Sequence, residues 1–226
     1  MIGLAPEDLC RLIQIYRVFW LKNAFSALRG IMETFPTAVL VFSGKRKSGK
    51  DFVTERLMER FGTEICEIIR LSEPLKKQYA LEKNLDFERL LDSTSYKEQY
   101  RSDMIHWGEE KRNQDPGFFC RVATSGNEVK KPLWIVSDAR RKTDIEYFKE
   151  HFPDITKTVR VAASKSTRES RGFIFTTGVD DAESECGLDN VSFDFEIIND
   201  GDDEVLRNSL QEIEHEVNMK ILHGEG

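Results

Sequence analysis

The sequence predicts an α/β fold in which a central parallel sheet is covered by helices on both faces. Short apolar runs alternate along the chain with segments of helical periodicity, and the first run, residues 38–42, is apolar at every position, as in a strand buried on both faces. The 226 residues are 39% hydrophobic and 32% charged, which is typical of a globular chain and not of a disordered or membrane-embedded one. This length suits one domain with an appendage.

The elements follow in order from these patterns. Residues 51–61 have apolar side chains at positions 53, 57, 58 and 61, which is helical spacing, and Gly62 ends the helix. Ser95-x-x-Glu98 is a capping box that begins a helix ending near Pro116. The remaining predicted strands cover residues 65–71, 132–136, 158–162 and 195–198, and the remaining predicted helices cover residues 143–152 and 204–222.

Charge and cysteine usage exclude two classes of function. Lys and Arg number 33 against 40 Asp and Glu, a net charge of −7, which argues against non-specific nucleic-acid binding. The four cysteines lie far apart, form no C-x-x-C pair and do not cluster with the histidines, so a zinc site is not expected and free thiols are; they are Cys10, Cys66, Cys120 and Cys186.

The N-terminal residues 1–37 form a separate extension. Between Leu9 and Met32 there is no acid, and the charges there are Arg11, Arg17, Lys22 and Arg29. Four charges spread through this stretch argue against a membrane-spanning helix. A basic amphipathic helix is typical of an organelle presequence or of a membrane-surface anchor, and a helix that packs on the domain or has no role is the alternative.

Residues 44–50 read Gly-Lys-Arg-Lys-Ser-Gly-Lys, the pattern G-x-x-x-x-G-K between a buried strand and a helix. Gly44 and Gly49 let the backbone curl so that successive N–H groups face an anion, and the following helix adds its positive end. The pattern therefore predicts a phosphate-binding loop whose Lys50 reaches the β and γ phosphates of a nucleotide. Asp51 stands where Ser or Thr usually binds Mg²⁺, and its carboxylate is an equally suitable hard ligand.

A second group of candidates follows the predicted strand 132–136. Asp138 lies at a carboxyl end of the sheet, where ligands bind in folds of this kind and where an acid can orient a metal; a helix cap is the alternative. Arg140 and Arg141 come next, and two adjacent arginines repel one another unless an anion lies between them.

Two further basic stretches are candidates. Lys97, Arg101 and Arg112 fall within about 60° of one another on the helix that begins at Ser95, either as part of a site or as a solvated face. Arg160, Arg168 and Arg171 precede a segment, residues 180–189, that holds five acids and no base. This charge pattern predicts a mobile lid, with a surface loop of compensating charges as the equal alternative.

The order of these motifs resembles the phosphomevalonate kinase family of animals. The matching runs are SGKRKSGKDF at 43–52, RLS at 70–72, PLK at 74–76, YKE at 96–98, WGEEKR at 107–112, DPGFFCR at 115–121, VSD at 136–138 and GVDDAESECGLDN at 178–190. The resemblance spans residue 38 to the C-terminus and leaves residues 1–37 outside.

The resemblance implies a nucleoside-monophosphate-kinase-like P-loop fold with an arginine-bearing lid over about residues 164–190. It implies ATP- and Mg²⁺-dependent phosphorylation of (R)-5-phosphomevalonate to (R)-5-diphosphomevalonate, with release of ADP, in isoprenoid and sterol biosynthesis. On this basis ATP contacts Gly44, Lys45, Arg46, Lys47, Ser48, Gly49, Lys50, Asp51, Arg160, Arg168, Arg171 and Asn199. Phosphomevalonate contacts Lys76, Lys97, Arg101, Arg112, Arg121, Arg140 and Arg141. The catalytic residues are Lys50, Arg46, Arg140 and Asp138, and the Mg²⁺ ligands, direct or through water, are Asp51 and Asp138.

Several alternatives and expectations accompany this assignment. Another small-molecule or nucleoside monophosphate kinase of the same fold is the main alternative, whereas a non-catalytic nucleotide-binding module would not need so many arginines for an acceptor. We expect small-molecule partners only, no integral membrane segment and a monomer. The expected location is the cytosol. The family resemblance makes the peroxisome an alternative, although residues 223–226 carry no peroxisomal signal, and the N-terminal extension could direct the chain to an organelle.

Overall fold

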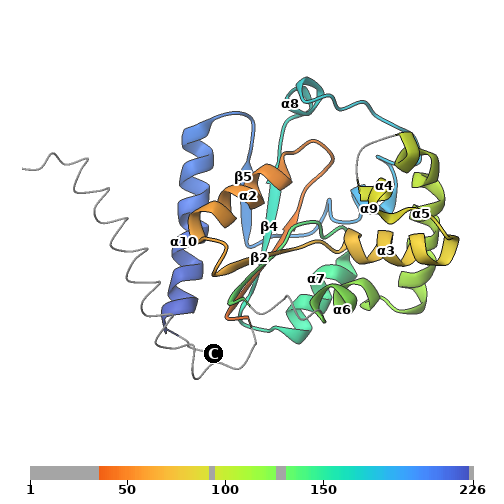
Figure 1. The fold of residues 1–226 in the computed structure, drawn as a ribbon. Helices are drawn as coiled ribbons and strands as arrows, with labels where there is room; N and C mark the ends of the chain where they lie inside the picture. The colour runs from red at the N-terminus through yellow and green to blue at the C-terminus, as the bar shows by residue number, and fades with distance from the viewer. Residues whose placement is uncertain (1–35, 92–94, 126–130, 224–226) are drawn as a thin grey trace, which may run out of the picture. The chain divides into compact units, whose positions relative to one another are not determined.

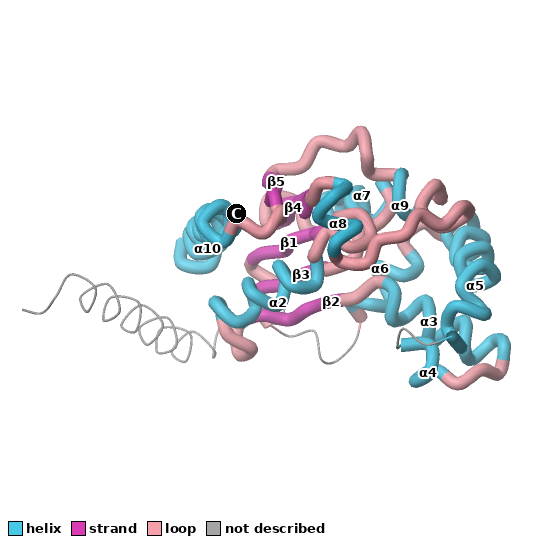
Figure 2. Tube along the Cα trace, turned by 90° about the horizontal axis from the view of Figure 1, so that it is seen from above, coloured by secondary structure: helices cyan, strands magenta, loops and turns pink. Residues whose placement is uncertain are grey.

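A computed structural model describes residues 36–91, 95–125 and 131–223. The expectations about the N-terminal extension therefore lie outside the described residues, except at Pro36 and Thr37. The described chain contains a five-stranded sheet in the order β2-β3-β1-β4-β5, and all neighbouring strands are parallel. The strands are β1 (Ala38–Ser43), β2 (Cys66–Ile69), β3 (Leu133–Val136), β4 (Thr156–Ala162) and β5 (Phe195–Ile198). Figure 2 shows them side by side in this order, which confirms the predicted parallel sheet.

Helices cover both faces of the sheet, as the sequence predicts. Side chains alternate along β1, so that Leu40 and Phe42 face one core and Val39 and Val41 face the other. The first core is closed by α2 (Lys50–Phe61) and α10 (Asp203–His223), and the second by α6 (Phe118–Thr124) and α7 (Lys142–His151). Figure 1 shows α2 and α10 together at one side of the sheet and α6 and α7 at the other. The central strand β1 is buried along its whole length.

A group of helices with its own core lies between β2 and β3 in the chain. It consists of α3 (Ser72–Lys83), α4 (Phe87–Leu91) and α5 (Ser95–Gln114), and its core includes Tyr79, Leu90, Met104 and Trp107. The sequence patterns predicted α5 but neither α3 nor α4. Of the twelve residues of α3 only Tyr79 and Ala80 are buried, and Leu81 is exposed, so its apolar stripe is too weak to predict a helix.

The segment between β4 and β5 contains two short helices, α8 (Lys165–Ser170) and α9 (Glu183–Cys186). The Ser164 hydroxyl caps α8 by accepting the Thr167 N–H at 3.2 Å. Gly172 and Gly178 both have a positive φ, near +80°, where the chain turns between the two helices. Residues 164–190 are those for which a lid is predicted; that role stays a prediction, and we refer to this segment as the lid. Because all five strands are parallel, the loops that follow them lie at one edge of the sheet, and the lid starts from that edge.

Candidate active site

The predicted phosphate loop lies between β1 and α2, as its pattern requires. Gly49 has φ +84°, and a Cβ there would come within 2.2 Å of the Asn199 side-chain nitrogen. A Cβ on Gly44 would come within 2.7 Å of the Val161 carbonyl oxygen. Both positions therefore require glycine, because a Cβ would clash at each of them and because Gly49 also has a left-handed backbone conformation. The N-terminus of the twelve-residue helix α2 directly follows the loop and provides a positive dipole end for an anion.

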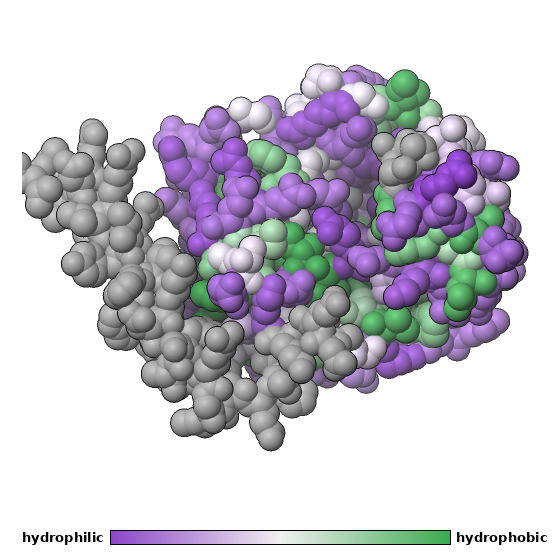
Figure 3. Space-filling view, viewed as in Figure 1, coloured by the Kyte–Doolittle hydropathy of each residue, from purple (hydrophilic) through white to green (hydrophobic). Residues whose placement is uncertain are grey.

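A cavity of about 560 Å³ connects this loop to the helical group, the end of β3 and the lid. Hydrophilic side chains dominate the face seen in Figure 3, both over α2 and over α3 and α5. Thirteen of the predicted site residues line the cavity: Gly44, Arg46, Lys47, Gly49, Lys50, Asp51, Lys76, Lys97, Arg101, Arg112, Asp138, Arg140 and Arg141. The sequence-distant basic residues thus surround one space that begins at the phosphate loop.

Lys50 lies at the loop end of the cavity. Its side chain is only 11% exposed, and its Nζ lies 3.5 Å from Asp51 Oδ1. Burial lowers the pKa of Lys50 below its usual value, and this effect outweighs the opposing charges of Asp138 and Asp51. A buried ammonium with this little compensation is suited to bind an anion.

Asp138 holds the ends of two strands together. Its Oδ1 accepts the Leu71 N–H at 2.6 Å and its Oδ2 accepts the Ser72 N–H at 3.0 Å. These bonds turn the chain from β2 into α3, which is why β2 ends at Ile69 and not at Leu71 as predicted. Burial alone would raise the pKa of Asp138, but the Lys50 charge and the two N–H groups outweigh it and lower the pKa. The carboxylate therefore stays ionised.

The cavity is also lined by three arginines, Arg112, Arg140 and Arg141. Among the described residues, Arg112 Nε and Arg141 Nε and Nη1 are buried without a hydrogen-bond partner. Arg141 is 6% exposed, and burial lowers its pKa, although Asp144 acts in the opposite direction. Such donors need acceptors, and an anionic group in the cavity would supply them.

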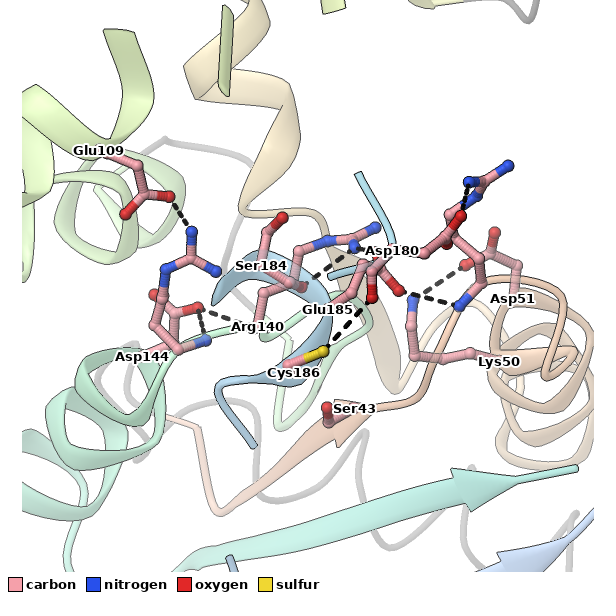
Figure 4. A network of polar contacts seen from close by, with 12 residues as sticks. Ser43, Lys50, Asp51, Glu109, Arg140, Asp144, Asp180, Ser184, Glu185 and Cys186 are labelled. Atoms are coloured by element: carbon pink, nitrogen blue, oxygen red, sulfur yellow. Dashed lines mark hydrogen bonds and ion pairs between the residues drawn. The ribbon is translucent and has the colours of Figure 1, made fainter. Parts of the chain in front are cut away.

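Carboxylates that the sequence analysis did not single out orient these arginines. Asp144, fully buried at the start of α7, accepts the backbone N–H groups of Arg140 and Arg141 at 2.9 and 3.0 Å and lies 3.9 Å from Arg112 Nε. The Glu109 carboxylate on α5 pairs with the Arg141 guanidinium (Figure 4). These contacts join side chains 32 positions apart or pair a side chain with a backbone N–H, and neither kind of contact gives a sequence motif.

The basic stripe of α5 faces the cavity. Lys97, Arg101 and Arg112 all line it, which favours a site over the alternative of a solvated face. Lys76 on α3 lines it as well, and its pKa is lowered first by burial and then by the neighbouring Lys97 charge. Arg101 pairs with Glu98, and this hydrogen bond raises the pKa of Arg101.

The remaining predicted residues lie outside the cavity lining. Arg171 donates to the carbonyl oxygens of Lys47, Ser48 and Asn199 at 3.4, 3.1 and 2.8 Å. Asn199 donates to the Ser48 carbonyl at 2.8 Å. Both residues therefore stabilise the loop through its carbonyl groups. The others contact neighbouring side chains: Lys45 pairs with Asp189, Arg160 with Ser43 and Asp189, Arg168 stacks on Phe173, and Arg121 pairs with Asp115. Arg121, which is half-exposed, is thus not brought to the other candidates.

The acidic part of the lid contacts the phosphate loop. Asp180 Oδ2 accepts from Arg46 Nη1 at 2.7 Å, and Glu185 Oε2 accepts from the Arg46 backbone N–H at 3.0 Å (Figure 4). The sequence showed the acids of residues 180–189 as a group, but it did not show which of them reach the loop.

Neither a metal-binding cluster of three or more His, Cys, Asp or Glu residues nor a helix long and apolar enough to span a membrane occurs in the described part of the chain.

The comparisons with known proteins agree with this geometry. The sequence profile of the phosphomevalonate kinase family matches residues 42–154. A phosphomevalonate kinase of Drosophila melanogaster is 44% identical over 170 residues, which are 74% of this chain and 89% of that protein. Among solved structures, TT1252 from Thermus thermophilus is 16% identical, with a TM-score of 0.49 over 81% of this chain and 99% of that chain. A shikimate kinase from Bacteroides thetaiotaomicron is 10% identical, with a TM-score of 0.47 over 80% and 98%.

The two structural likenesses are too distant to carry functional information, whereas the sequence matches cover at least half of the chain at high similarity. Together with the phosphate loop and the arginine-lined cavity beside it, they establish that the chain belongs to the phosphomevalonate kinase family.

Proposed function

We propose that the chain transfers the γ-phosphoryl group of ATP to the phosphate of (R)-5-phosphomevalonate, forming (R)-5-diphosphomevalonate and ADP. This reaction is a step of isoprenoid and sterol biosynthesis by the mevalonate route. One observation carries the proposal: a single cavity is lined both by a phosphate loop and by Arg112 and Arg141, whose guanidinium groups hold buried nitrogens without a hydrogen-bond partner among the described residues. A donor anion and an acceptor anion can therefore bind in one space.

The donor side holds the ATP phosphates. The loop residues 44–49 offer backbone N–H groups, and Arg46, Lys47 and Lys50 add charge at the cavity wall. Arg171 and Asn199 hold the loop through its carbonyl groups, and Arg160 on β4 and Arg168 on α8 would serve the nucleotide, as the family resemblance implies.

The donor set also fits Mg²⁺. The Asp51 carboxylate lines the cavity, its side chain is 70% exposed, and one carboxylate together with substrate phosphates is the usual environment of this ion. Both oxygens of Asp138 already accept backbone N–H groups, so this residue would act on the ion through water. When bound, Mg²⁺ would neutralise charge on the β and γ phosphates.

The acceptor side matches a substrate that has a phosphate at one end, a carboxylate at the other and a hydrocarbon chain between them. Arg112, Arg140 and Arg141 provide planar forks for the phosphate, and Lys76, Lys97 and Arg101 provide charge for the carboxylate. The cavity lining also includes the apolar side chains of Leu71, Leu75, Met104 and Ile105, which suit the methyl-bearing chain.

The transfer needs charge neutralisation more than a general base. The acceptor is already an oxyanion near neutral pH, but it must approach a polyphosphate of the same sign. Lys50, Arg46 and Arg140 would neutralise the charge as it moves between the two phosphates, and Asp138 would hold Lys50 in its charged form. Closure of the lid would exclude water, which would otherwise compete as the acceptor.

The alternative, a nucleoside monophosphate kinase, predicts a different acceptor. The test is the release of ADP from ATP and Mg²⁺ with 5-phosphomevalonate, mevalonate or each nucleoside monophosphate as the acceptor. The proposal expects turnover with 5-phosphomevalonate alone. Turnover with a nucleoside monophosphate and none with 5-phosphomevalonate would contradict it.

A further inference from the structure

Glu185 joins the donor and acceptor sides of the cavity. It belongs to α9 in the lid, and its side chain is only 5% exposed. Oε2 accepts the backbone N–H of Arg46 in the phosphate loop at 3.0 Å, and Oε1 pairs with the guanidinium of Arg140 at the end of β3. Figure 4 shows Glu185 beside Arg140. One carboxylate thus contacts two residues that stand 94 positions apart in the chain.

We propose that Glu185 is a positioning residue that fixes Arg140 relative to the phosphate loop. The inference rests on the proposed function, in which Arg140 acts on the transferred group. Transfer requires that the donor and acceptor phosphates be aligned, and an error of about 1 Å can cost about 100-fold in rate. A carboxylate that holds the loop backbone and the guanidinium together sets this alignment before the substrates arrive.

Both oxygens of Glu185 are needed for this role. Each accepts from a different donor, so a glutamine in the same place would turn its NH₂ group toward either the Arg46 N–H or the Arg140 guanidinium. An aspartate would keep two acceptor oxygens but is one methylene shorter. The Arg140 guanidinium also donates to the Ser184 carbonyl at 3.4 Å, so part of its position survives the loss of Glu185.

Neighbouring acids do not duplicate this contact. Asp180 pairs with the side chain of Arg46 and accepts the Thr176 N–H at 2.8 Å, which leaves Arg140 untouched. Glu183 lies on the same short helix as Glu185 but is exposed, so Glu183→Gln is a matched control for the loss of one charge from α9.

The test is a double-mutant cycle of Glu185→Gln and Arg140→Met, with Glu183→Gln as the control and the unfolding midpoint of each variant measured in parallel. We expect Glu185→Gln to lower kcat about 30-fold or more, with both KM values within about threefold of the unaltered protein. In the Arg140→Met background, Glu185→Gln should lower kcat less than about threefold, because a residue that acts by positioning Arg140 has no effect once Arg140 is absent. Glu185→Asp should restore part of kcat, and Glu183→Gln should keep at least about half of it.

Three results would overturn the inference. The first is an equal loss from Glu185→Gln with and without Arg140, which would show that the two residues act independently. The second is tighter ATP binding with unchanged kcat, which would show that Glu185 competes with a phosphate. The third is a Glu185→Asp variant that folds normally but has no detectable turnover. An unaltered protein that phosphorylates a nucleoside monophosphate instead would contradict the proposed function, and the same cycle run with that acceptor would still test Glu185.

Discussion

Two buried basic side chains show how burial favours the binding of an anion such as phosphate. Lys50 and Arg141 are both buried cations whose pKa is lowered mainly by burial. Each lies on the wall of a cavity that can admit anions. Burying a charge costs free energy in the ligand-free protein, and a bound phosphate would recover part of that cost. The same groups therefore reduce stability and promote substrate binding.

Lys50 gives the first prediction at this scale. Lys50→Met should lower turnover at least about 100-fold, because its charge is needed most as negative charge moves between phosphates. Turnover and the circular dichroism spectrum measure the effect and the fold. Lys77→Met, at an exposed position of α3, is the control and should leave turnover unchanged. A loss below about tenfold, about 1.4 kcal/mol of barrier, would refute the assignment of the phosphate loop.

The pKa of Lys50 gives a second prediction. Burial lowers it from the usual 10.5 in the ligand-free protein, and a polyphosphate would raise it again, so ATP binding takes up a proton in the alkaline range. Affinity for ATP should therefore weaken as pH rises above the lowered pKa. The unfolded state holds this proton up to its own higher pKa, so the contribution of Lys50 to stability rises with pH over the same window. Titration of ATP from pH ~7 to ~10 measures the first effect, and Lys50→Met should flatten it.

The acceptor arginines give a third prediction. Arg112→Lys and Arg141→Lys should each raise the KM for 5-phosphomevalonate about tenfold or more while the KM for ATP changes less than about threefold, because an ammonium cannot replace a planar fork. Steady-state kinetics with each substrate varied separates the two. Arg60→Lys, at an ion pair with Glu214 on the α2–α10 side, is the control. A rise for ATP alone, or an equal rise for both, would show that the arginines do not serve the acceptor.

At the scale of the element, the contact between the lid and the phosphate loop is the most informative. Arg171 follows α8 and donates to three carbonyl oxygens, two of them in the loop. Arg171→Met should raise the KM for ATP about fivefold or more and leave the KM for 5-phosphomevalonate unchanged, because the loop loses support behind its anion-binding face. Lys165→Met on α8 is exposed and provides the comparison. Equal effects of the two substitutions would place Arg171 outside the nucleotide site.

The sequence predicts the helices and strands that bury an apolar face in a core. It misses the short helices that are stabilised by contacts between residues far apart in the chain. The strands and α2, α7 and α10 have clear apolar patterns, and α5 is predicted by the capping box at Ser95. The ends of all these elements lie within two residues of the predicted ones. The short helices α4, α6, α8 and α9 have seven residues or fewer, too few for a pattern to show. Among site residues, Lys50 and Asp138 stand in motifs, whereas Glu185 was missed because its contacts with the loop cross 139 positions. Such pairs become visible only when the lid and the sheet are brought together.

At the scale of the whole molecule, the residues that the structure describes between 36 and 223 form the five-stranded sheet and line the cavity. The Thr37 N–H, just before β1, already bonds to the Pro132 carbonyl, just before β3, at 2.7 Å. A chain that begins at Pro36 should therefore keep its full specific activity and most of its thermal stability. A chain that begins at Val41 should fail to fold, because it lacks half of the central strand. Loss of ATP binding on removal of residues 1–35 would show that these residues belong to the kinase core.

The identity of the acceptor tests the central claim most directly. The chain is incubated with ATP labelled in the γ-phosphate, Mg²⁺ and an equimolar mixture of 5-phosphomevalonate and the nucleoside monophosphates, and the labelled products are separated. We predict that the label appears in the terminal phosphate of 5-diphosphomevalonate and in no nucleoside diphosphate. Label in a nucleoside diphosphate, or in inorganic phosphate alone, would contradict the account.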